Sequence, residues 1–400
     1  MTGKTLNTID NVDVAGKRVL VRCDLNVPMA DGKVTDATRL ERVAPGIADL
    51  ARRGARVVVV SHYERPKTRD PKYSLKPIAA KLGEILARPI MFADDCIGVP
   101  AEAAVSALVN GDIVVLENLR YHKGEEKNDP EFARELARNG DIYVGEAFST
   151  SHRAHASTEG VTHLLPSYAG PLMAAEINAL RGALDHPQRP TAAVVGGAKV
   201  STKLPILTNL VARVDKLLIG GGMANTFLKA QGLDVGKSLC EADLVGTCNE
   251  VLAAAKDKGC EIVLPTDGVI AREFKAGAAS EVVPVTAIPS DAMMLDIGPA
   301  SIVHMTKVLE GCKTVLWNGP MGAFEIEPFG KGTFALAQAA ARLTKEGKLM
   351  SVAGGGDTVA ALNAAHVTDQ FSYVSTAGGA FLEWLEGREL PGVAALMKSA

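Results

Sequence analysis

The sequence lacks the features that mark secreted, membrane-spanning and disulfide-stabilised proteins. Its N-terminal segment contains no apolar core of a signal peptide, and no run approaches the roughly 18 apolar residues that cross a membrane. The cysteines form no CxxC pair and no metal-ligand spacing, so we expect reduced thiols and no disulfide framework. These absences predict a cytoplasmic protein with no membrane partner. The cysteines are Cys23, Cys96, Cys240, Cys248, Cys260 and Cys312.

An excess of positive charge is also lacking. Lys and Arg number 43 against 46 Asp and Glu, a formal net charge of −3, so no net positive field favours nucleic-acid binding. The content of 47% hydrophobic and 22% charged residues is that of an ordinary globular protein. A chain of 400 residues is long enough for two or three domains with full cores.

Short β-branched runs alternate with alanine- and leucine-rich segments at helical spacing. Strand runs that are apolar throughout and separated by helices indicate parallel sheets covered on both faces. The sequence therefore predicts an α/β fold with two doubly wound, Rossmann-like parallel-sheet domains joined by a hinge. The expected strands are Arg18–Cys23, Arg56–Ser61, Asp112–Leu116, Asp141–Val144, Ala192–Val195, Lys216–Ile219, Glu261–Leu264, Thr314–Trp317 and Lys348–Val352. The expected helices include Thr38–Arg53, Leu75–Ala87, Phe132–Asn139, Leu244–Lys258 and Thr333–Glu346.

The domain boundary is expected between Pro166 and Pro190. A helix-like stretch over Leu172–Leu184 runs into a segment with Pro187 and Pro190, and two prolines within four residues stop a helix and stiffen a connection. We expect a first domain over residues 1–175, a hinge helix over 176–190, a second domain over 191–385 and a tail over 386–400.

Arg and His residues follow the strand runs of the first half. Ligands of parallel sheets sit beyond the carboxyl ends of the strands, so these residues are expected at one edge. A single Arg could equally be a solvated loop residue or an internal ion-pair partner. Together they indicate a site for a small, acidic, hydroxylated ligand, because Arg binds carboxylate or phosphate through two N–H groups. The basic residues are Arg22, Arg39, His62, Arg65, Arg120, His152, Arg153 and His155, with Asp24 and Asn26 able to fix a hydroxyl.

Phosphate-binding features gather in the second half. Gly220–Gly222 and Gly354–Gly356 each follow an apolar run and open a helix, which presents free N–H groups and a positive helix end to phosphate. A glycine turn alone is also typical of a tight helix cap. Asp357 adds a carboxylate able to hold Mg²⁺ beside the phosphates, and Glu325 could accept a ribose hydroxyl.

Two lysines add positive charge to this half. Lys199 and Lys203 are four residues apart and are predicted on one helix face, where their ammonium groups could meet phosphates in transit. The Walker A pattern is absent, so this is not a P-loop. The GxGxxG pattern is absent too, which disfavours a nicotinamide dehydrogenase.

Six segments resemble the signature blocks of the phosphoglycerate kinase family, in the family's order and over essentially the whole chain. The resemblance implies a two-domain monomer that transfers a phosphoryl group reversibly between 1,3-bisphosphoglycerate and ADP, giving 3-phosphoglycerate and MgATP in glycolysis. It also implies that Leu390–Met397 packs back on the N-terminal domain. The six segments are Arg22–Pro28, Glu117–Tyr121, His152–Thr158, Gly196–Lys203, Trp317–Glu325 and Gly354–Thr358.

Carried over block by block, the resemblance assigns residues to two sites. The phosphoglycerate site is Asp24, Asn26, Arg39, His62, Arg65, Arg120 and Arg153. The nucleotide site is Lys199, Lys203, Gly220, Gly221, Gly222, Asn318, Glu325, Gly354, Gly355, Gly356, Asp357 and Thr358, with Asp357 on the metal and Gly220–Gly222 beside the adenine. The developing charge of the transferred group is assigned to Arg39 and Lys203, helped by backbone amides near Gly355 and Gly378.

Two positions depart from the family pattern. Glu64 stands where the family usually has a glycine, and we expect its carboxylate to face solvent because it would repel an anionic substrate. Ala377 stands where the first of three glycines is more usual, so it must have ordinary backbone geometry.

The expected mechanism is direct in-line transfer, which needs no side-chain nucleophile. Because the two sites fall on different domains, the domains must close around both substrates and expel water. The alternative is a nucleotide-regulated binding protein without turnover. It would keep the glycine turns but would not need Lys203 opposite a pocket around Arg39.

Overall fold

The computed structural model describes residues 4–399 and divides the chain into two units. Unit 1 comprises residues up to Ile177 together with Glu389 and the residues after it, and unit 2 comprises Asn178–Arg388. Residues 1–3 of the expected first domain and residue 400 of the expected tail lie outside the described residues. No helix among the described residues is long and apolar enough to span a membrane.

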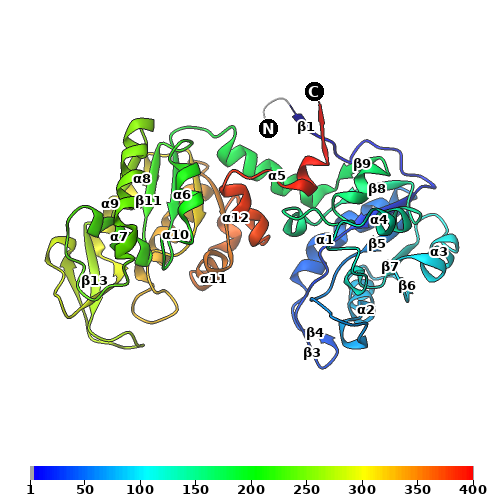
Figure 1. The fold of residues 1–400 in the computed structure, drawn as a ribbon, viewed down its shortest axis with the longest axis horizontal. Helices are drawn as coiled ribbons and strands as arrows, with labels where there is room; N and C mark the ends of the chain where they lie inside the picture. The colour runs from blue at the N-terminus through cyan, green and yellow to red at the C-terminus, as the bar shows by residue number, and fades with distance from the viewer. Residues whose placement is uncertain (1–3, 400) are drawn as a thin grey trace. The chain divides into compact units, whose positions relative to one another are not determined.

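Unit 1 is built on a six-stranded parallel sheet (Figure 1). Its strands, in spatial order, are β6 (Met91–Ala93), β7 (Ile113–Leu116), β5 (Arg56–Val60), β2 (Arg18–Arg22), β8 (Ile142–Gly145) and β9 (Ser167–Ala169). Its helices are α1 (Thr38–Arg52), α2 (Lys76–Ile85), α3 (Gly98–Ser106), α4 (Pro130–Ala137), the first part of α5 (Pro171–Leu184) and α13 (Pro391–Ala394). The 3-10 helices are η1 (Pro71–Tyr73), η2 (Leu119–Tyr121), η3 (Phe148–Thr150) and η4 (Gly160–His163).

Alternation along β5 explains why this sheet is covered on both faces. Val57 and Val59 join a core cluster with Leu40 and Ile47 of α1, whereas Val58 and Val60 are equally buried and point to the opposite face. A strand buried on both faces reads as a continuous apolar run, which is the pattern visible in the sequence.

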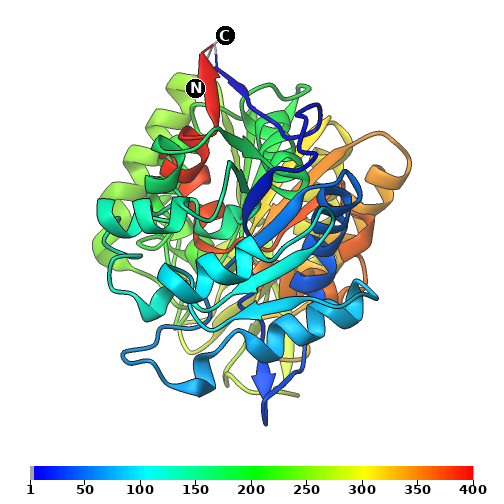
Figure 2. The same cartoon turned by 90° about the vertical axis from the view of Figure 1, so that its right-hand side faces the viewer.

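Two small antiparallel pairs complete unit 1. β3 (Met29–Ala30) pairs with β4 (Lys33–Val34). β1 (Lys4–Leu6) pairs with β19 (Met397–Ser399), so the two ends of the described chain lie side by side (Figure 2). The backbone of Gly392 also donates to the carbonyl of Ser151, which joins the C-terminal segment to unit 1.

Unit 2 holds the second six-stranded parallel sheet. Its strands, in spatial order, are β12 (Glu261–Val263), β11 (Lys216–Ile219), β10 (Thr191–Val195), β16 (Thr314–Asn318), β17 (Met350–Gly354) and β18 (Tyr373–Ser375). An antiparallel sheet adds β14 (Ser280–Pro284), β13 (Asp267–Ala271) and β15 (Met293–Ile297). The helices are the rest of α5, α6 (Leu204–Leu210), α7 (Gly221–Ala230), α8 (Val245–Lys258), α9 (Pro299–Glu310), α10 (Lys331–Lys345), α11 (Gly356–Ala364) and α12 (Gly379–Leu385), with 3-10 helices η5 (Ala242–Leu244), η6 (Val285–Ala287) and η7 (Thr368–Gln370).

The order of the parallel strands in unit 2 fixes where a ligand can bind. Numbered by their order along the chain, the strands lie in the spatial order 3-2-1-4-5-6, so the strand order reverses between the parallel strands β10 and β16. In doubly wound sheets of this order the crevice lies beyond the carboxyl ends of the two strands at the reversal. Those ends are Val195 and Asn318, which are paired in register.

The α/β fold with two parallel sheets is confirmed, but the sequence reading missed several elements. The three short edge strands β6, β9 and β18 were not predicted, and neither was the antiparallel sheet around β13. Short edge strands bury only a few side chains, so their runs carry little periodic signal.

Candidate functional site

The carboxyl ends of β2, β5 and β7 bring the predicted acid-binding residues to one edge of the unit 1 sheet. Asp24 and Asn26 follow β2, His62 and Arg65 follow β5, and Arg120 follows β7. Arg39 enters from the first turn of α1, and Arg153 from the segment after η3. The parallel register of these strands is the reason that residues far apart in sequence share this edge.

Backbone carbonyls and nearby carboxylates hold two of the arginines. Arg39 donates from Nη1 to the carbonyl of Asn26 at 2.7 Å, and lies 3.2 Å from the carboxylate of Asp24. Arg120 donates from Nη1 to the carbonyl of Glu64 at 2.7 Å. Each guanidinium carries five N–H donors, so these contacts position the group and leave donors for an anion.

The loop after β5 is shaped by Glu64. This residue is exposed, as expected, and adopts a left-handed φ of +52°, the conformation that explains the glycine of the family pattern at this position. Its amide donates to the side-chain oxygen of Asn26 at 3.1 Å. A glutamate is therefore tolerated here because its backbone makes the structural contacts and its carboxylate is exposed.

Several arginine side chains lie close enough to His62 to affect its protonation. Burial lowers the pKa of this imidazole well below its usual value, and the charges of Arg22, Arg120 and Arg39 lower it further. Burial and the charges of Arg22, Arg120 and Arg153 lower the pKa of His155 to about 4. Both rings are therefore neutral at physiological pH. We name the basic cluster as Arg22, Arg39, His62, Arg65, Arg120, Arg153 and His155, which interact electrostatically with one another.

The basic cluster includes Arg22 and His155, which are not among the phosphoglycerate-site residues implied by the family resemblance. Arg22 is the last residue of β2, and His155 lies in the segment after η3. Both were visible in the sequence, but only tertiary contacts show that both are buried beside His62. Glu125 lies near Arg22 and Arg120, fully buried, in the turns that follow η2 and not directly at a strand end. No sequence signal pointed to that carboxylate.

The strand reversal in unit 2 gathers the second set of predicted residues. Gly221 has a φ of +68°, and a Cβ there would lie 2.6 Å from the carbonyl oxygen of Gly197. Gly319 likewise packs against the backbone of Gly196. Only glycine allows these backbones to approach so closely, so the glycines hold the β10, β11 and β16 ends together.

A chain of hydrogen bonds links Lys203 to the last glycine turn. The ammonium of Lys203 donates to the side-chain oxygen of Asn318, whose amide donates to the carbonyl of Gly354 at 2.7 Å. The amide of Gly319 donates to the hydroxyl of Thr358 at 2.7 Å. Burial lowers the pKa of Lys203, and the charges of Asp357 and Glu386 partly offset this. A partly desolvated cation thus lies near the helix end that begins at Gly356.

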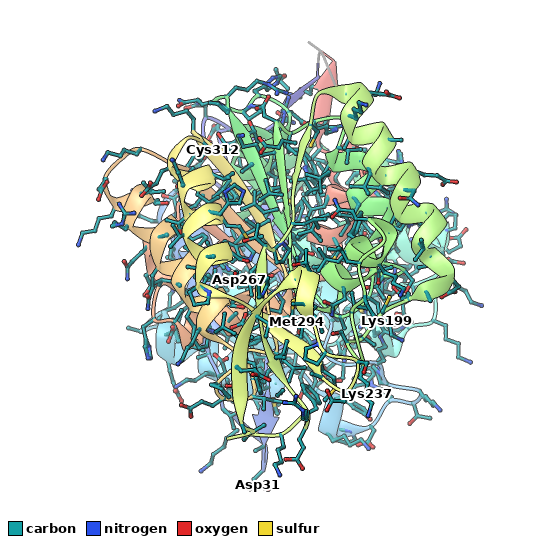
Figure 3. All side chains as sticks on the ribbon, turned by 90° about the vertical axis from the view of Figure 1, so that its left-hand side faces the viewer. Asp31, Lys199, Lys237, Asp267, Met294 and Cys312 are labelled. Atoms are coloured by element: carbon teal, nitrogen blue, oxygen red, sulfur yellow. The ribbon has the colours of Figure 1, made fainter. Side chains whose placement is uncertain are left out.

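The prediction that Lys199 and Lys203 share a helix face is wrong. Helix α6 begins only at Leu204, and both lysines lie in the irregular loop before it. Lys199 is exposed at the surface of unit 2 (Figure 3), whereas Lys203 is half-buried. Pro205 in the first turn of α6 explains the late start, because proline favours the first helical positions and disfavours a helical conformation before it.

Both glycine turns open helices, as predicted. Gly355 precedes α11 with a φ of +98°, and Gly220 precedes α7. Asp357 is exposed in the first turn of α11, and Glu325 is exposed in the loop after β16. Gly378 has a φ of +55° before α12, while Ala377 keeps an ordinary negative-φ backbone, as expected.

Comparisons with known proteins agree with one another. A family model described as phosphoglycerate kinase matches residues 9–388. A relative named phosphoglycerate kinase from Methylorubrum extorquens (strain PA1) is 63% identical over 391 residues, 97% of this chain and 98% of that protein. One from Sinorhizobium medicae (strain WSM419) is 62% identical over 394 residues, 98% of each chain. The solved structure of phosphoglycerate kinase from Coxiella burnetii matches with a TM-score of 0.92 and 42% identity, covering 98% of this chain and 99% of that chain.

Proposed function

The chain belongs to the phosphoglycerate kinase family, and from this premise we propose that it transfers a phosphoryl group reversibly between 1,3-bisphosphoglycerate and ADP. The products are 3-phosphoglycerate and ATP, in glycolysis and gluconeogenesis. The observation that carries the proposal is the pairing of two sites on two sheets: a basic cluster suited to a small acid, and glycine turns with a desolvated lysine suited to a nucleotide.

The basic cluster is proposed to bind phosphoglycerate. Arg65, Arg120 and Arg153 supply donors for its phosphate, because a guanidinium binds phosphate oxygens through paired N–H groups. Asp24 and Asn26 are proposed to fix its hydroxyl, and His62 to donate a neutral N–H. Arg39, placed at the start of α1, is proposed to meet the carboxyl end, where the transferred group arrives.

The glycine turns are proposed to bind the nucleotide. The N-terminus of α11 offers free N–H groups to the phosphates, Gly220–Gly222 lie beside the adenine and Glu325 accepts from the ribose. Asn318 orients Lys203 through the bond between their side chains. The hydroxyl of Thr358 holds the strand end at Gly319, and exposed Lys199, in the same loop as Lys203, adds positive charge.

Asp357 fits a role as the magnesium ligand. Its carboxylate is exposed beside the amide-rich turn, and a Cβ added at Gly356 would meet no other atom within 4 Å, so the space next to it is open. Magnesium in nucleotide sites is usually held by one or two carboxylates together with phosphate oxygens. When bound, the ion would neutralise charge on the phosphates.

The chain's own groups are proposed to stabilise the transfer. Arg39 and Lys203 neutralise the charge that spreads over the oxygens of the phosphoryl group, and the amides near Gly355 and Gly378 donate to the same oxygens. No side chain forms a covalent bond. Since each substrate binds to a different unit, closure of the two units is proposed to complete the site and exclude water.

The protein is proposed to act as a cytoplasmic monomer. All six cysteines lie among the described residues and are free thiols, which agrees with a reducing compartment.

A coupled assay tests the proposed function. Purified protein is incubated with 3-phosphoglycerate and MgATP, and formation of 1,3-bisphosphoglycerate is followed by its reduction with NADH through glyceraldehyde-3-phosphate dehydrogenase. We expect turnover that requires all three of 3-phosphoglycerate, ATP and Mg²⁺. Nucleotide binding without turnover would instead identify a non-catalytic binding protein.

A further inference from the structure

Glu125 is a carboxylate buried without an obvious reason. Its side chain is fully buried in unit 1, where burial raises its pKa and the charge of Arg22 opposes this rise. It accepts from the amide of Ser157 at 3.0 Å and from the hydroxyl of Ser157 at 2.6 Å. A buried charge is costly unless it is paired and hydrogen-bonded, so this arrangement needs an explanation beyond packing.

The hydroxyl of Ser157 connects this carboxylate to Arg22. A serine hydroxyl has one proton, and here it is donated to Glu125. The lone pairs of the same oxygen are therefore available to the Nε–H of Arg22, which lies 2.8 Å away. Arg22 is itself 1% exposed, and its Nη1 donates to the carbonyl of Cys23. The Nε and Nη1 donors of Arg22 therefore both have partners, and these two bonds fix the plane of the guanidinium.

The fixed guanidinium of Arg22 determines which ring nitrogen of His62 carries the proton. The Nη2 atom of Arg22 lies 3.1 Å from Nδ1 of His62. Arginine has only donors, so Nδ1 must be the acceptor and cannot carry a proton. The single proton of the neutral ring is then on Nε2. A doubly protonated ring would place two donors against each other at this contact.

We propose that Glu125 is a positioning residue: through Ser157 and Arg22 it holds His62 in the tautomer that carries its proton on Nε2. His62 then presents an N–H donor of fixed orientation to the anionic substrate, without adding a charge to an already cationic site. The proposal rests on the function proposed above for the basic cluster. Removing a link frees Arg22 to turn, and both tautomers of His62 become accessible.

The chain offers a matched control at the same serine. The hydroxyl of Tyr143, which is buried on β8, donates to the backbone carbonyl of Ser157 at 2.8 Å. Tyr143→Phe therefore removes a buried hydrogen bond to Ser157 and leaves the bonds among Glu125, the Ser157 hydroxyl and Arg22 in place. A purely structural role of this region would make the control resemble the test variants.

The tautomer is measured directly by NMR on the full chain labelled with ¹⁵N-histidine, with the His62 signals assigned by their loss in His62→Gln. Wild type is expected to show a protonated Nε2 and an unprotonated Nδ1 for His62. Ser157→Ala and Glu125→Leu, which leaves no acceptor for the Ser157 hydroxyl, are expected to populate the Nδ1–H tautomer, and Tyr143→Phe is expected to keep the wild-type signals. Either an unchanged tautomer in both test variants or a wild-type Nδ1–H tautomer overturns the proposal. An equal change in Tyr143→Phe does so too.

Kinetics provide the second readout. We expect Ser157→Ala and Glu125→Leu to raise KM for 3-phosphoglycerate by about tenfold to a hundredfold, the range for losing a hydrogen bond with a charged partner, and to leave KM for ATP unchanged. The double variant should be no worse than the more affected single variant, because both act through Arg22. Additive losses, or equal losses for both substrates, contradict the proposal. A wild-type protein with the expected tautomer but no turnover would instead contradict the proposed function alone.

Discussion

At the scale of single residues, the protein's own polar groups hold the cations that are proposed to act in the reaction. Arg39 is held by the carbonyl of Asn26 and Arg120 by the carbonyl of Glu64, while Lys203 is held by the side chain of Asn318. Such groups lose little conformational freedom when an anion binds, so more of the interaction energy serves binding and transfer.

Replacing Arg39 tests its role in transfer. Arg39→Ala should lower kcat by roughly 10² to 10³, the usual loss when one donor to a developing charge is removed. Arg52→Ala is the control, because Arg52 lies on the same helix with 77% of its side chain exposed. Steady-state rates at saturating concentrations of both substrates measure kcat for the two variants and wild type. A kcat equal to that of the control would show that Arg39 does not act on the transferred group.

Replacing Asp357 tests the metal ligand. Asp357→Asn should weaken binding of MgATP by at least roughly tenfold, because loss of one charged ligand costs about 1.5–3 kcal/mol, and should leave binding of 3-phosphoglycerate unchanged. Calorimetry with each ligand separately gives both constants. Titration with ATP and EDTA is the control, since without Mg²⁺ the variant should bind ATP at least as tightly as wild type, whose carboxylate then repels the phosphates. Equal losses for both ligands would indicate misfolding and not a lost metal ligand.

At the scale of elements, turns and helix ends place these residues. The turn before α11 fits against Asn318, and the segment before α5 fits against Glu146 at the end of β8. In both cases a helix N-terminus is fixed by a side chain from a neighbouring strand end. Glu146 also accepts from amide groups at the start of α5 that have no partner within that helix.

Two glycines separate the effect of the turn from that of adding a methyl group to a helix. A Cβ at Gly355 would lie 2.5 Å from the side-chain nitrogen of Asn318 and require a φ of +98°, whereas a Cβ at Gly246, exposed in the first turn of α8, would meet nothing within 4 Å. Gly355→Ala should therefore displace Asn318 and Lys203 and reduce kcat/KM for ATP by about fivefold to a hundredfold, an effect of about 1–3 kcal/mol for forcing this backbone. Gly246→Ala, outside the proposed site, should stay near wild type. Similar losses in both variants would contradict the argument.

The buried carboxylate of Glu146 makes stability depend on pH. Burial raises the pKa of this carboxyl to about 7. The hydrogen bonds that it accepts from the amides of Met173 and Leu172 lower the pKa and offset only part of this rise. The folded protein therefore binds a proton between about pH 4.5 and 7 that the unfolded chain releases, so this group's contribution to stability is lost as pH rises through 7.

Glu146→Gln removes this dependence and keeps an acceptor oxygen for both amides. Relative to the variant, wild type should lose about 3 kcal/mol of unfolding free energy between pH 4.5 and 8, because a shift of about 2.5 pKa units corresponds to that amount. Urea unfolding at several pH values measures the difference. Glu84→Gln, at an exposed position on α2, should follow wild type. Parallel curves for wild type and Glu146→Gln would refute the assignment.

At the scale of the whole molecule, the two substrates are proposed to belong to different units. Reacting atoms must come within about 3–3.5 Å, so transfer is proposed to require closure of the two units around both substrates. Either substrate alone gains little from a closed form, whereas the pair contacts both units and can shift the population toward closure.

Small-angle scattering tests this closure. We expect the largest decrease in radius of gyration with 3-phosphoglycerate and a non-hydrolysable MgATP analogue together, and a smaller one with either ligand alone. A disulfide that holds the units apart should abolish turnover and preserve both single-ligand affinities. Turnover in that cross-linked protein, with no added compaction in the ternary complex, would disprove the closure mechanism.

The architecture and the residue types at the sheet edges could be predicted from local sequence. Continuous apolar runs separated by amphipathic segments are dictated by sheets buried on both faces, and they located β2, β5, β10, β11 and β16 to within a residue or two. Residues such as Asp24, His62 and Arg120 were found for the same reason, because the end of a buried strand is a local signal.

Which of these residues touch one another depends on the folded chain and could not be predicted. The late start of α6, the left-handed backbone of Glu64 and the contact of Lys203 with Asn318 depend on packing between segments that are distant in sequence. The bonds from Glu125 through Ser157 to Arg22 join residues 32 and 135 positions apart. A buried hydrogen-bond network has no periodicity along the chain, so it becomes visible only when folding brings its members together.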